Sequence, residues 1–191
     1  MREQAANYKK IDYKGEAYFF HENVFAKVTN ANQVFEWKYN GLFRNFVVLL
    51  QKNNMVFLTR RERFNAAHRL FCEDFSDEKN LEVFGKCSNP NWHGHNYELF
   101  VTVCGPVDPD TGFVINIKIL SDIIIKNIID KIDHKNINLE VDFMMGRQPS
   151  AENIAVAIWE HLTPFLAKQN AKLHCIKLCE TENNFVEYFG D

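Results

Sequence analysis

The sequence predicts an α+β fold, an antiparallel four-stranded sheet with two helices packed on one face. Strand-like patterns open and close the region from 55 to 191, helix-like apolar stripes lie between them, and apolar residues form 46% of the chain. At 191 residues the chain is long enough for one well-buried core. A sheet of this kind has exposed edges, which oligomerisation could close.

The first strand is predicted in "VFLTRRERFNAAH", residues 56–68, where Phe57, Phe64 and Ala66 should reach the core. The segment after it, "SDEKNLEVFG", begins with Ser76, a residue typical of a helix N-cap, and has acidic residues in the next turn. A short helix or a long loop should therefore follow the first strand.

The second strand is predicted over residues 96–107, "NYELFVTVCGPV", and should end at its Gly-Pro pair. The next segment, "DPDTG" at 108–112, predicts a turn. Its position between two β-like runs suggests a hairpin. Alternating apolar residues should share one face of the strand: Tyr97, Leu99, Val101 and Val103.

Two helices and two further strands complete the predicted fold. Residues 117–132 repeat apolar side chains at helical spacing, and a second helix should begin after "QPSAEN" and end near residues 164–168. The tail "KLHCIKLCETENNFVEYFG" predicts two strands joined by the polar turn "TENN". The expected apolar stripes are Leu120, Ile123, Ile124, Ile128 and Ile132 in the first helix, and Ile154, Ala155, Ile158, Leu162 and Phe165 in the second.

Residues 1–54 differ from the rest of the chain. They are rich in aromatic side chains, show no sustained period of 2 or 3.6, and contain few turn signals. Met55 stands directly before the first clear strand pattern. We therefore expect a domain at 55–191 preceded by an extension at 1–54 of unknown role, which is either an appendage or no part of the native protein.

Composition excludes several classes of function. The net charge of −3 gives no electrostatic footprint for nucleic acid. The apolar runs are too short or too interrupted to cross a bilayer, so no membrane partner is expected. Five cysteines without a CxxC pair, and no signal peptide at the start, favour free thiols in a reducing compartment and a cytoplasmic location.

Histidines in the central region are candidate metal ligands. His93 and His95 flank one glycine, so on a strand both side chains project from the same face. His68, in the first predicted strand, can lie opposite them on a neighbouring antiparallel strand. Three histidines and an open position are typical of a catalytic Zn²⁺ site. The alternative is a pair of surface histidines without a ligand role.

Three further sites carry chemistry. Cys87 lies in a polar, turn-rich loop beside Lys86, which suits a reactive thiol, although a lone cysteine can also be a ligand or an apolar filler. Asp133 and His134 can form a proton relay, or His134 can simply favour a helix C-terminus. Glu180 is a carboxylate in an apolar stretch, so it should have a partner or face a ligand.

The segments "FNAAHRL", "FGKCSNPNWHGHNY", "DHKN", "SAEN" and "CETENNFVEY" closely resemble the 6-pyruvoyltetrahydropterin synthase and 6-carboxytetrahydropterin synthase family over residues 55–191. The resemblance implies a tunnelling fold (T-fold), assembled as a homohexameric barrel with the site between subunits. It also implies a Zn²⁺ site made by His68, His93 and His95.

The resemblance further assigns roles around the metal. Cys87 would be the proton-abstracting thiolate, with Asp133 and His134 completing the proton transfer. The pterin ring of the substrate, 7,8-dihydroneopterin triphosphate, would be bound by Glu180, with Glu152 and Ser150 contributing. In the implied reaction zinc binds the side-chain oxygens, the thiolate removes the acidified proton, and triphosphate leaves.

Two positions depart from the family pattern. Many members carry glycine at Trp92, so the rim of the pocket should differ here. Animal pyruvoyl-type members often show two threonines at Ser150 and Ala151, so this chain lacks one hydroxyl at the pterin contact.

The product is open at this stage. The spacing from Cys87 to His93 resembles pyruvoyl-type enzymes, whereas "WHGHN" and "FVEYFG" resemble chains of the queuosine biosynthesis branch. These segments favour a lyase that forms 6-carboxy-5,6,7,8-tetrahydropterin and releases acetaldehyde and triphosphate. The alternatives are a 6-pyruvoyltetrahydropterin synthase of the tetrahydrobiopterin type, a non-catalytic pterin-binding protein, and a zinc hydrolase that uses metal-bound water.

Overall fold

A computed structural model describes the backbone of five short segments before residue 48 and most of the chain from residue 55. It divides the chain into two compact units, Met1–Lys52 and Asn53–Asp191. No helix in the described part is both long and apolar enough to cross a membrane. The described residues are 9–13, 16–21, 24–28, 34–39, 42–47, 55–169 and 171–190.

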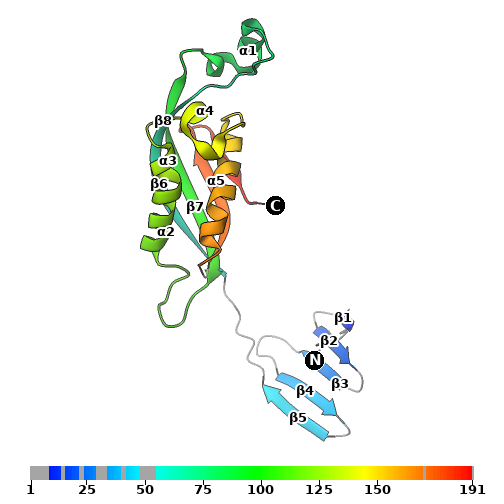
Figure 1. Cartoon of the computed structure of the whole chain (residues 1–191). Coiled ribbons are helices and arrows are strands. Elements are labelled where there is room, and N and C mark those ends of the chain that lie inside the picture. The colour runs from blue at the N-terminus through cyan, green and yellow to red at the C-terminus, as the bar shows by residue number, and fades with distance from the viewer. Residues whose placement is uncertain are drawn as a thin grey trace, which may run out of the picture. The chain divides into compact units, whose positions relative to one another are not determined.

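The first unit contains a five-stranded antiparallel sheet in which consecutive strands are neighbours (Figure 1). The absence of a sustained period before residue 55 therefore does not exclude strands there. The strands have only five or six residues, too few for a sustained period, but they are rich in aromatic and β-branched residues. They are β1 (Lys9–Tyr13), β2 (Glu16–His21), β3 (Val24–Val28), β4 (Val34–Tyr39) and β5 (Leu42–Val47).

The second unit is an α+β fold built on a mixed five-stranded sheet of order β10-β9-β7-β6-β8. The four predicted strands are present and pair antiparallel with one another. The predicted sheet lacked β8, which pairs parallel with β6 and has two residues, too short to leave a pattern in the sequence. The strands are β6 (Met55–His68), β7 (His93–Pro106), β8 (Lys135–Asn136), β9 (Lys172–Cys179) and β10 (Phe185–Tyr188).

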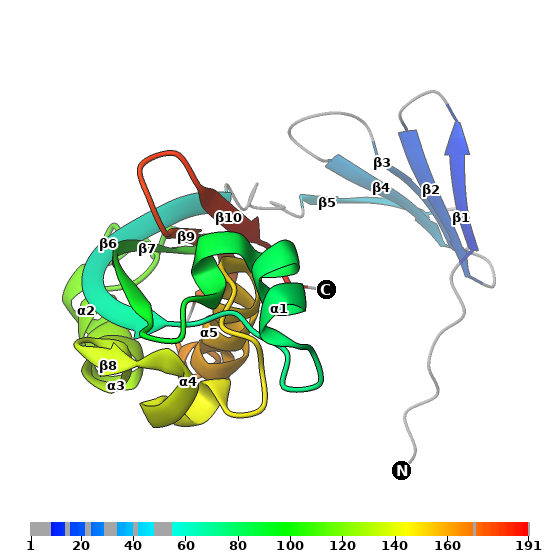
Figure 2. The ribbon, with the colours of Figure 1, turned by 90° about the horizontal axis from the view of Figure 1, so that it is seen from above.

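Helices cover one face of this sheet (Figures 1 and 2). The predicted helix at 117–132 is a continuous helical segment made of α2 (Ile117–Ile124), the π-helical turn η2 (Ile125–Ile129) and α3 (Asp130–Ile132). The second predicted helix is α5 (Ala151–Leu166). Side chains of both stripes and of β7 are completely buried between helices and sheet: Leu120, Ile124, Ile128, Ile132, Ile154, Ala155, Ile158, Leu162, Tyr97, Leu99, Val101 and Val103.

A long connection between β6 and β7 carries α1 (Asp77–Phe84) and the 3-10 turn η1 (Gly85–Ser88). Ser76 caps α1 as predicted, because its hydroxyl accepts a hydrogen bond from the backbone N–H of Lys79 at 3.2 Å. Another irregular connection, between α3 and α5, holds α4 (Ile137–Glu140) and the 3-10 turn η3 (Asp142–Met144). These two connections lie at the end of the sheet where β6 ends and β7 begins (Figure 1).

Two local predictions were wrong. Phe57 is 55% exposed, because it lies seven positions before the buried Phe64 and an odd separation places two strand residues on opposite faces. The turn at 108–112 forms, with Asp108 accepting hydrogen bonds from two backbone N–H groups, but it leads into α2 and not into a hairpin strand. The strand that pairs with β7 on that side is β6.

Candidate functional site

Three histidines meet at one end of the sheet. In the antiparallel register of β6 and β7, His68 pairs with His93 and Ala66 pairs with His95. The three side chains lie on the helix-covered face, which Phe64 and Tyr97 share. One nitrogen from each ring lies within 4.8 Å of the others, so the three histidines converge as the strand patterns predicted.

The unpaired ring nitrogens of these histidines fit a metal ion. Within the described residues, Nε2 of His68, Nε2 of His95 and both ring nitrogens of His93 are buried without a hydrogen-bond partner. Buried polar atoms are costly to leave unpaired, and three imidazole nitrogens form a donor set that suits Zn²⁺. The carbonyl oxygen of Pro149 lies 2.7 Å from Nδ1 of His68. A carbonyl can only accept a hydrogen bond, so this contact keeps the proton of the His68 ring on Nδ1 and leaves the lone pair of Nε2 directed toward the cluster.

Burial also keeps the rings of His68 and His93 neutral. It is the main cause that lowers the pKa of His68 to about 4, with the neighbouring histidines adding to the effect. Burial likewise lowers the pKa of His93. At neutral pH His68 and His93 are therefore in the neutral form, which offers a lone pair to a metal.

Glu180 follows β9 and points at the histidines. Its Oε1 lies 3.5 Å from Nε2 of His68 and 3.8 Å from Nε2 of His95. The side chain is 21% exposed, so it borders both the cluster and solvent-accessible space. The expectation that this carboxylate has a partner or faces a ligand agrees with this geometry.

Cys87 lies between two cavities. One, of about 410 Å³, brings it together with Ser150, Glu152 and Glu180, so four predicted residues from three separate segments share one space. Ser150 also caps α5, where its hydroxyl accepts a hydrogen bond from the backbone N–H of Asn153 at 3.4 Å. The other cavity, of about 820 Å³, holds Cys87 beside His93 and His95.

Asp133 and His134 lie elsewhere in the fold. Nδ1 of His134 is 2.9 Å from Asp133 Oδ2, so the predicted pair forms, but the His134 side chain is 77% exposed. It borders a cavity of about 470 Å³ that also includes Gly94, His95 and Asn96 and does not include Cys87. A single copy of the protein therefore does not bring His134 into the cavities of Cys87.

The Asp133 carboxylate is fixed by the sheet. Its Oδ1 accepts a hydrogen bond from the backbone N–H of Asn65 at 2.7 Å. This bond, followed by those from His134, lowers the pKa of Asp133. His134 itself has a φ of 59°, an uncommon conformation for a residue other than glycine.

The sequence patterns did not predict two groups that contact the histidine cluster, the Tyr97 hydroxyl and the Pro149 carbonyl. Tyr97 was expected only in the core, yet its hydroxyl lies 3.5 Å from Nδ1 of His68, and burial followed by the charges of Glu180 and Cys87 raises its pKa. The carbonyl of Pro149 is a backbone group that no pattern of residue types reveals. Trp92 is half-buried and is not among the described residues that line these cavities, so its effect on the pocket rim stays a prediction.

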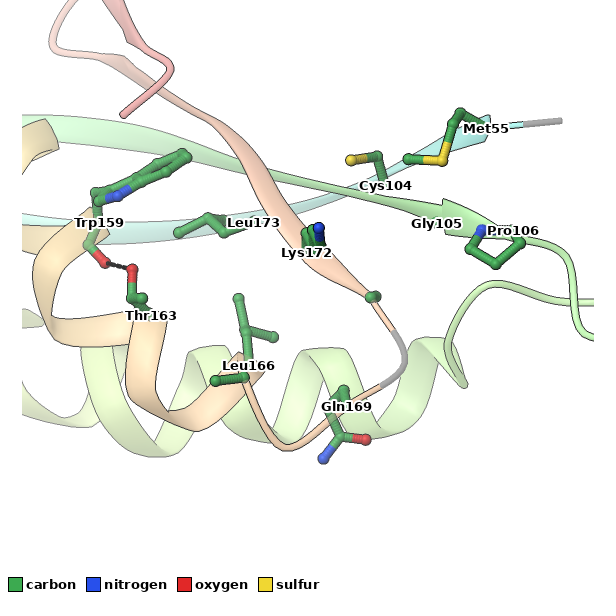
Figure 3. Close-up of a pocket in the computed structure, with 12 residues that line it drawn as sticks. Met55, Cys104, Gly105, Pro106, Trp159, Thr163, Leu166, Gln169, Lys172 and Leu173 are labelled. Atoms are coloured by element: carbon green, nitrogen blue, oxygen red, sulfur yellow. Dashed lines mark hydrogen bonds between the residues drawn. The ribbon is translucent and has the colours of Figure 1, made fainter. Parts of the chain in front are cut away.

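A further cavity of about 600 Å³ lies at the other end of the sheet, where Met55 pairs with Pro106. Figure 3 shows its wall, formed mainly by apolar side chains such as Trp159, Leu166 and Leu173. Its described wall contains no histidine or carboxylate, and the side chains there that could transfer a proton are Cys104, Lys172 and the Thr163 hydroxyl.

The fold and the histidine cluster define a class of α+β domains with a candidate three-histidine metal centre beside a cysteine. Residues 57–191 match the family model described as 6-pyruvoyl tetrahydropterin synthase. The chain therefore belongs to this family. The match covers nearly all of the second unit and none of the residues before 57.

Individual relatives agree with this membership. The chain is 43% identical over 134 residues to "6-pyruvoyl tetrahydrobiopterin synthase" of Homo sapiens, covering 70% of this chain and 91% of that protein. It is 32% identical over 149 residues to "6-carboxy-5,6,7,8-tetrahydropterin synthase" of Rickettsia conorii, covering 70% and 99%. A solved structure of the Caenorhabditis elegans 6-pyruvoyl tetrahydropterin synthase superimposes with a TM-score of 0.65 at 35% identity, covering 72% of this chain and 96% of that protein.

Proposed function

We propose that this protein is a zinc-dependent 6-pyruvoyltetrahydropterin synthase that eliminates triphosphate from 7,8-dihydroneopterin triphosphate. The observation that carries the proposal is the position of Cys87, which lines both a cavity with Glu152 and Glu180 and a cavity with His93 and His95. A thiol in that position can act on a substrate that binds to the carboxylates and the metal together.

The comparisons favour this product over the 6-carboxy product that parts of the sequence favoured. Relatives named 6-pyruvoyl tetrahydrobiopterin synthase are more similar to the protein, 43% for the human enzyme against 32% for the Rickettsia conorii 6-carboxy synthase. The 6-carboxy-5,6,7,8-tetrahydropterin synthase reaction, with acetaldehyde as co-product, is the second candidate. Mass analysis of the products made by the purified zinc-loaded protein distinguishes the two.

In the proposed reaction Glu180 accepts hydrogen bonds from the 2-amino group and N3–H of the pterin, and Glu152 and Ser150 complete the contact. These three residues share one cavity with Cys87, which places the aliphatic arm of the substrate beside the thiol. Bound zinc, held by His68, His93 and His95, would supply Lewis acidity that makes the C–H bonds of this arm more acidic. Cys87 then accepts the proton as a thiolate.

Asp133 and His134 would complete proton transfer from a neighbouring copy of the protein. Within one copy His134 does not share either cavity of Cys87, and its ring is exposed. A homohexamer with sites between subunits would bring the pair to a partner's Cys87. Mixing inactive Cys87→Ala and His134→Ala proteins tests this: mixed oligomers should regain activity if each site uses both subunits, and should stay inactive if it does not.

The proposal also includes a cellular location and the extent of the catalytic domain. The five cysteines are all free, which suits a reducing compartment, so we place the enzyme in the cytoplasm. The catalytic domain would be residues 55–191, with residues 1–54 an extension outside the reaction. A protein that starts at Met55 should then retain full turnover, and a loss of turnover would show that the extension takes part.

A non-catalytic pterin-binding protein is distinguished by one substitution. Cys87→Ala should leave zinc and pterin bound and abolish turnover in an enzyme, whereas a binding protein would be unaffected. A zinc hydrolase would keep its activity without this thiol.

A further inference from the structure

The sheet of the first unit has one face whose centre carries no charge. Strand residues alternate between the two faces, and residues paired across antiparallel strands share a face, so the registers assign each residue to a side. On one side the three central strands, β2 to β4, place no lysine, arginine, aspartate or glutamate. We call this side the apolar face, and its central rows contain Ala17, Phe19, Ala26, Val28, Phe35 and Trp37.

The opposite face of the same three strands has a different composition. A solvated sheet face typically mixes charged and apolar residues, whereas a face without charges typically packs on another layer. The described residues of the first unit form one sheet, with no second layer among them, so the apolar face needs an occupant from outside these residues. The charged residues of the opposite face in β2 to β4 are Glu16, Lys27, Glu36 and Lys38.

Charged residues at the margins of the apolar face indicate which layer fits it. β1 places Lys10 and Asp12 on this face, two positions apart. Lys10 is in register with Phe19 of β2, and the next row of the face joins Asp12 to Ala17. At the other margin, Arg44 of β5 stands in the same row as Lys10. Two neighbouring rows therefore differ in charge at β1 and in residue size at β2.

We propose that the apolar face binds the apolar face of a second copy of this chain, related by a twofold axis perpendicular to the strands. An axis between the two rows brings Lys10 of each copy opposite Asp12 of the other. It also brings Phe19 opposite Ala17, a large residue opposite a small one. An axis parallel to the strands would bring Lys10 opposite Arg44, and these two positive residues repel each other.

The small area of the face predicts a reversible association. Five strands about 4.8 Å apart, with about five residues each, cover about 400 Å² per copy, which is less than permanent interfaces bury. Dissociation constants on the order of micromolar are expected for such an interface, so the number of copies in a particle should rise with protein concentration. The association is independent of the proposed reaction, because residues 1–54 lie outside the proposed catalytic domain.

Sedimentation velocity of the full-length protein tests this interface. Particle size should rise as the concentration increases from about 1 to 100 μM, and this rise should be absent in protein that starts at Met55. Phe19→Glu should weaken the association by at least about tenfold, because it introduces a charge at the centre of the interface. Tyr18→Glu is the matched control and should associate like the wild type. Tyr18 is the neighbouring residue on the opposite face, and each position is in register with a lysine, Lys10 for Phe19 and Lys27 for Tyr18.

A charge exchange at the margin keeps the interface testable if Phe19→Glu fails to fold. Lys10→Glu and Asp12→Lys should each weaken the association by about threefold, because each brings like charges together between the copies, and the double variant should restore it. Equal particle sizes for the full-length protein and the protein that starts at Met55 would overturn the proposal, and this is the result expected if the second unit covers the face. Equal losses in Phe19→Glu and Tyr18→Glu, or no restoration in the double variant, would also overturn it.

Discussion

Replacing His93 with alanine tests the metal centre through two separate measurements. In the metal-free protein His93 buries two ring nitrogens that have no hydrogen-bond partner within the described residues. Each unpaired buried polar atom costs about 1–3 kcal/mol, and the lost packing of the ring acts in the opposite direction. We therefore expect the free energy of unfolding of the metal-free protein to change by no more than about 1 kcal/mol.

The effect on zinc should be much larger. Four-ligand structural sites bind zinc with about 10–16 kcal/mol, which is about 3 kcal/mol for each ligand. Loss of one of the three histidines should then weaken zinc binding by about 100-fold. Competition with a chromophoric chelator measures this affinity, and urea denaturation of the metal-free protein measures stability.

His161 provides the control. Its Nε2 is also buried without a partner among the described residues, but its ring packs against Phe143 and Phe165, away from the cluster. His161→Ala should leave zinc affinity unchanged. The reasoning would be refuted by unchanged zinc affinity in His93→Ala, or by an equal loss in both variants.

Three further predictions concern single positions. Cys87→Ala should lower turnover by at least about 100-fold, the scale of general-base catalysis, and keep bound zinc; rapid turnover by this variant would contradict the role of the thiol. Because Trp92 has a φ of 67°, Trp92→Gly should be more stable to urea than Trp92→Ala by about 1 kcal/mol, and equal stability would show that the conformation costs nothing. The lowered pKa of Asp133 contributes stability above the pKa of the unfolded state, about 3.9, which is lost as pH falls through the folded value. The melting temperatures of wild type and Asp133→Ala should thus converge below about pH 4, and a constant gap would exclude this linkage.

The sequence predicted those parts of the fold that depend on periodicity. The alternation of Tyr97 and Leu99 and the helical stripe ending at Ile132 were confirmed, since each buries one face of an element with a fixed repeat. The same rule places His93 and His95 on one side of β7. Phe57 was misassigned, since its odd separation from Phe64 places it on the exposed face of β6.

Other features left no pattern in the sequence. The parallel strand β8 has only two residues, and the contact of Pro149 with His68 uses a backbone carbonyl. Sequence proximity joined Asp133 and His134 correctly, but it gave no information on whether they would share a cavity with Cys87. That depends on where the backbone returns after α3, which is decided by packing across the whole domain.

The product of the reaction tests the central claim most directly. Zinc-loaded protein incubated with 7,8-dihydroneopterin triphosphate should yield 6-pyruvoyltetrahydropterin and triphosphate, identified by mass. Formation of 6-carboxytetrahydropterin with acetaldehyde, or no turnover by protein that holds zinc, would contradict the account.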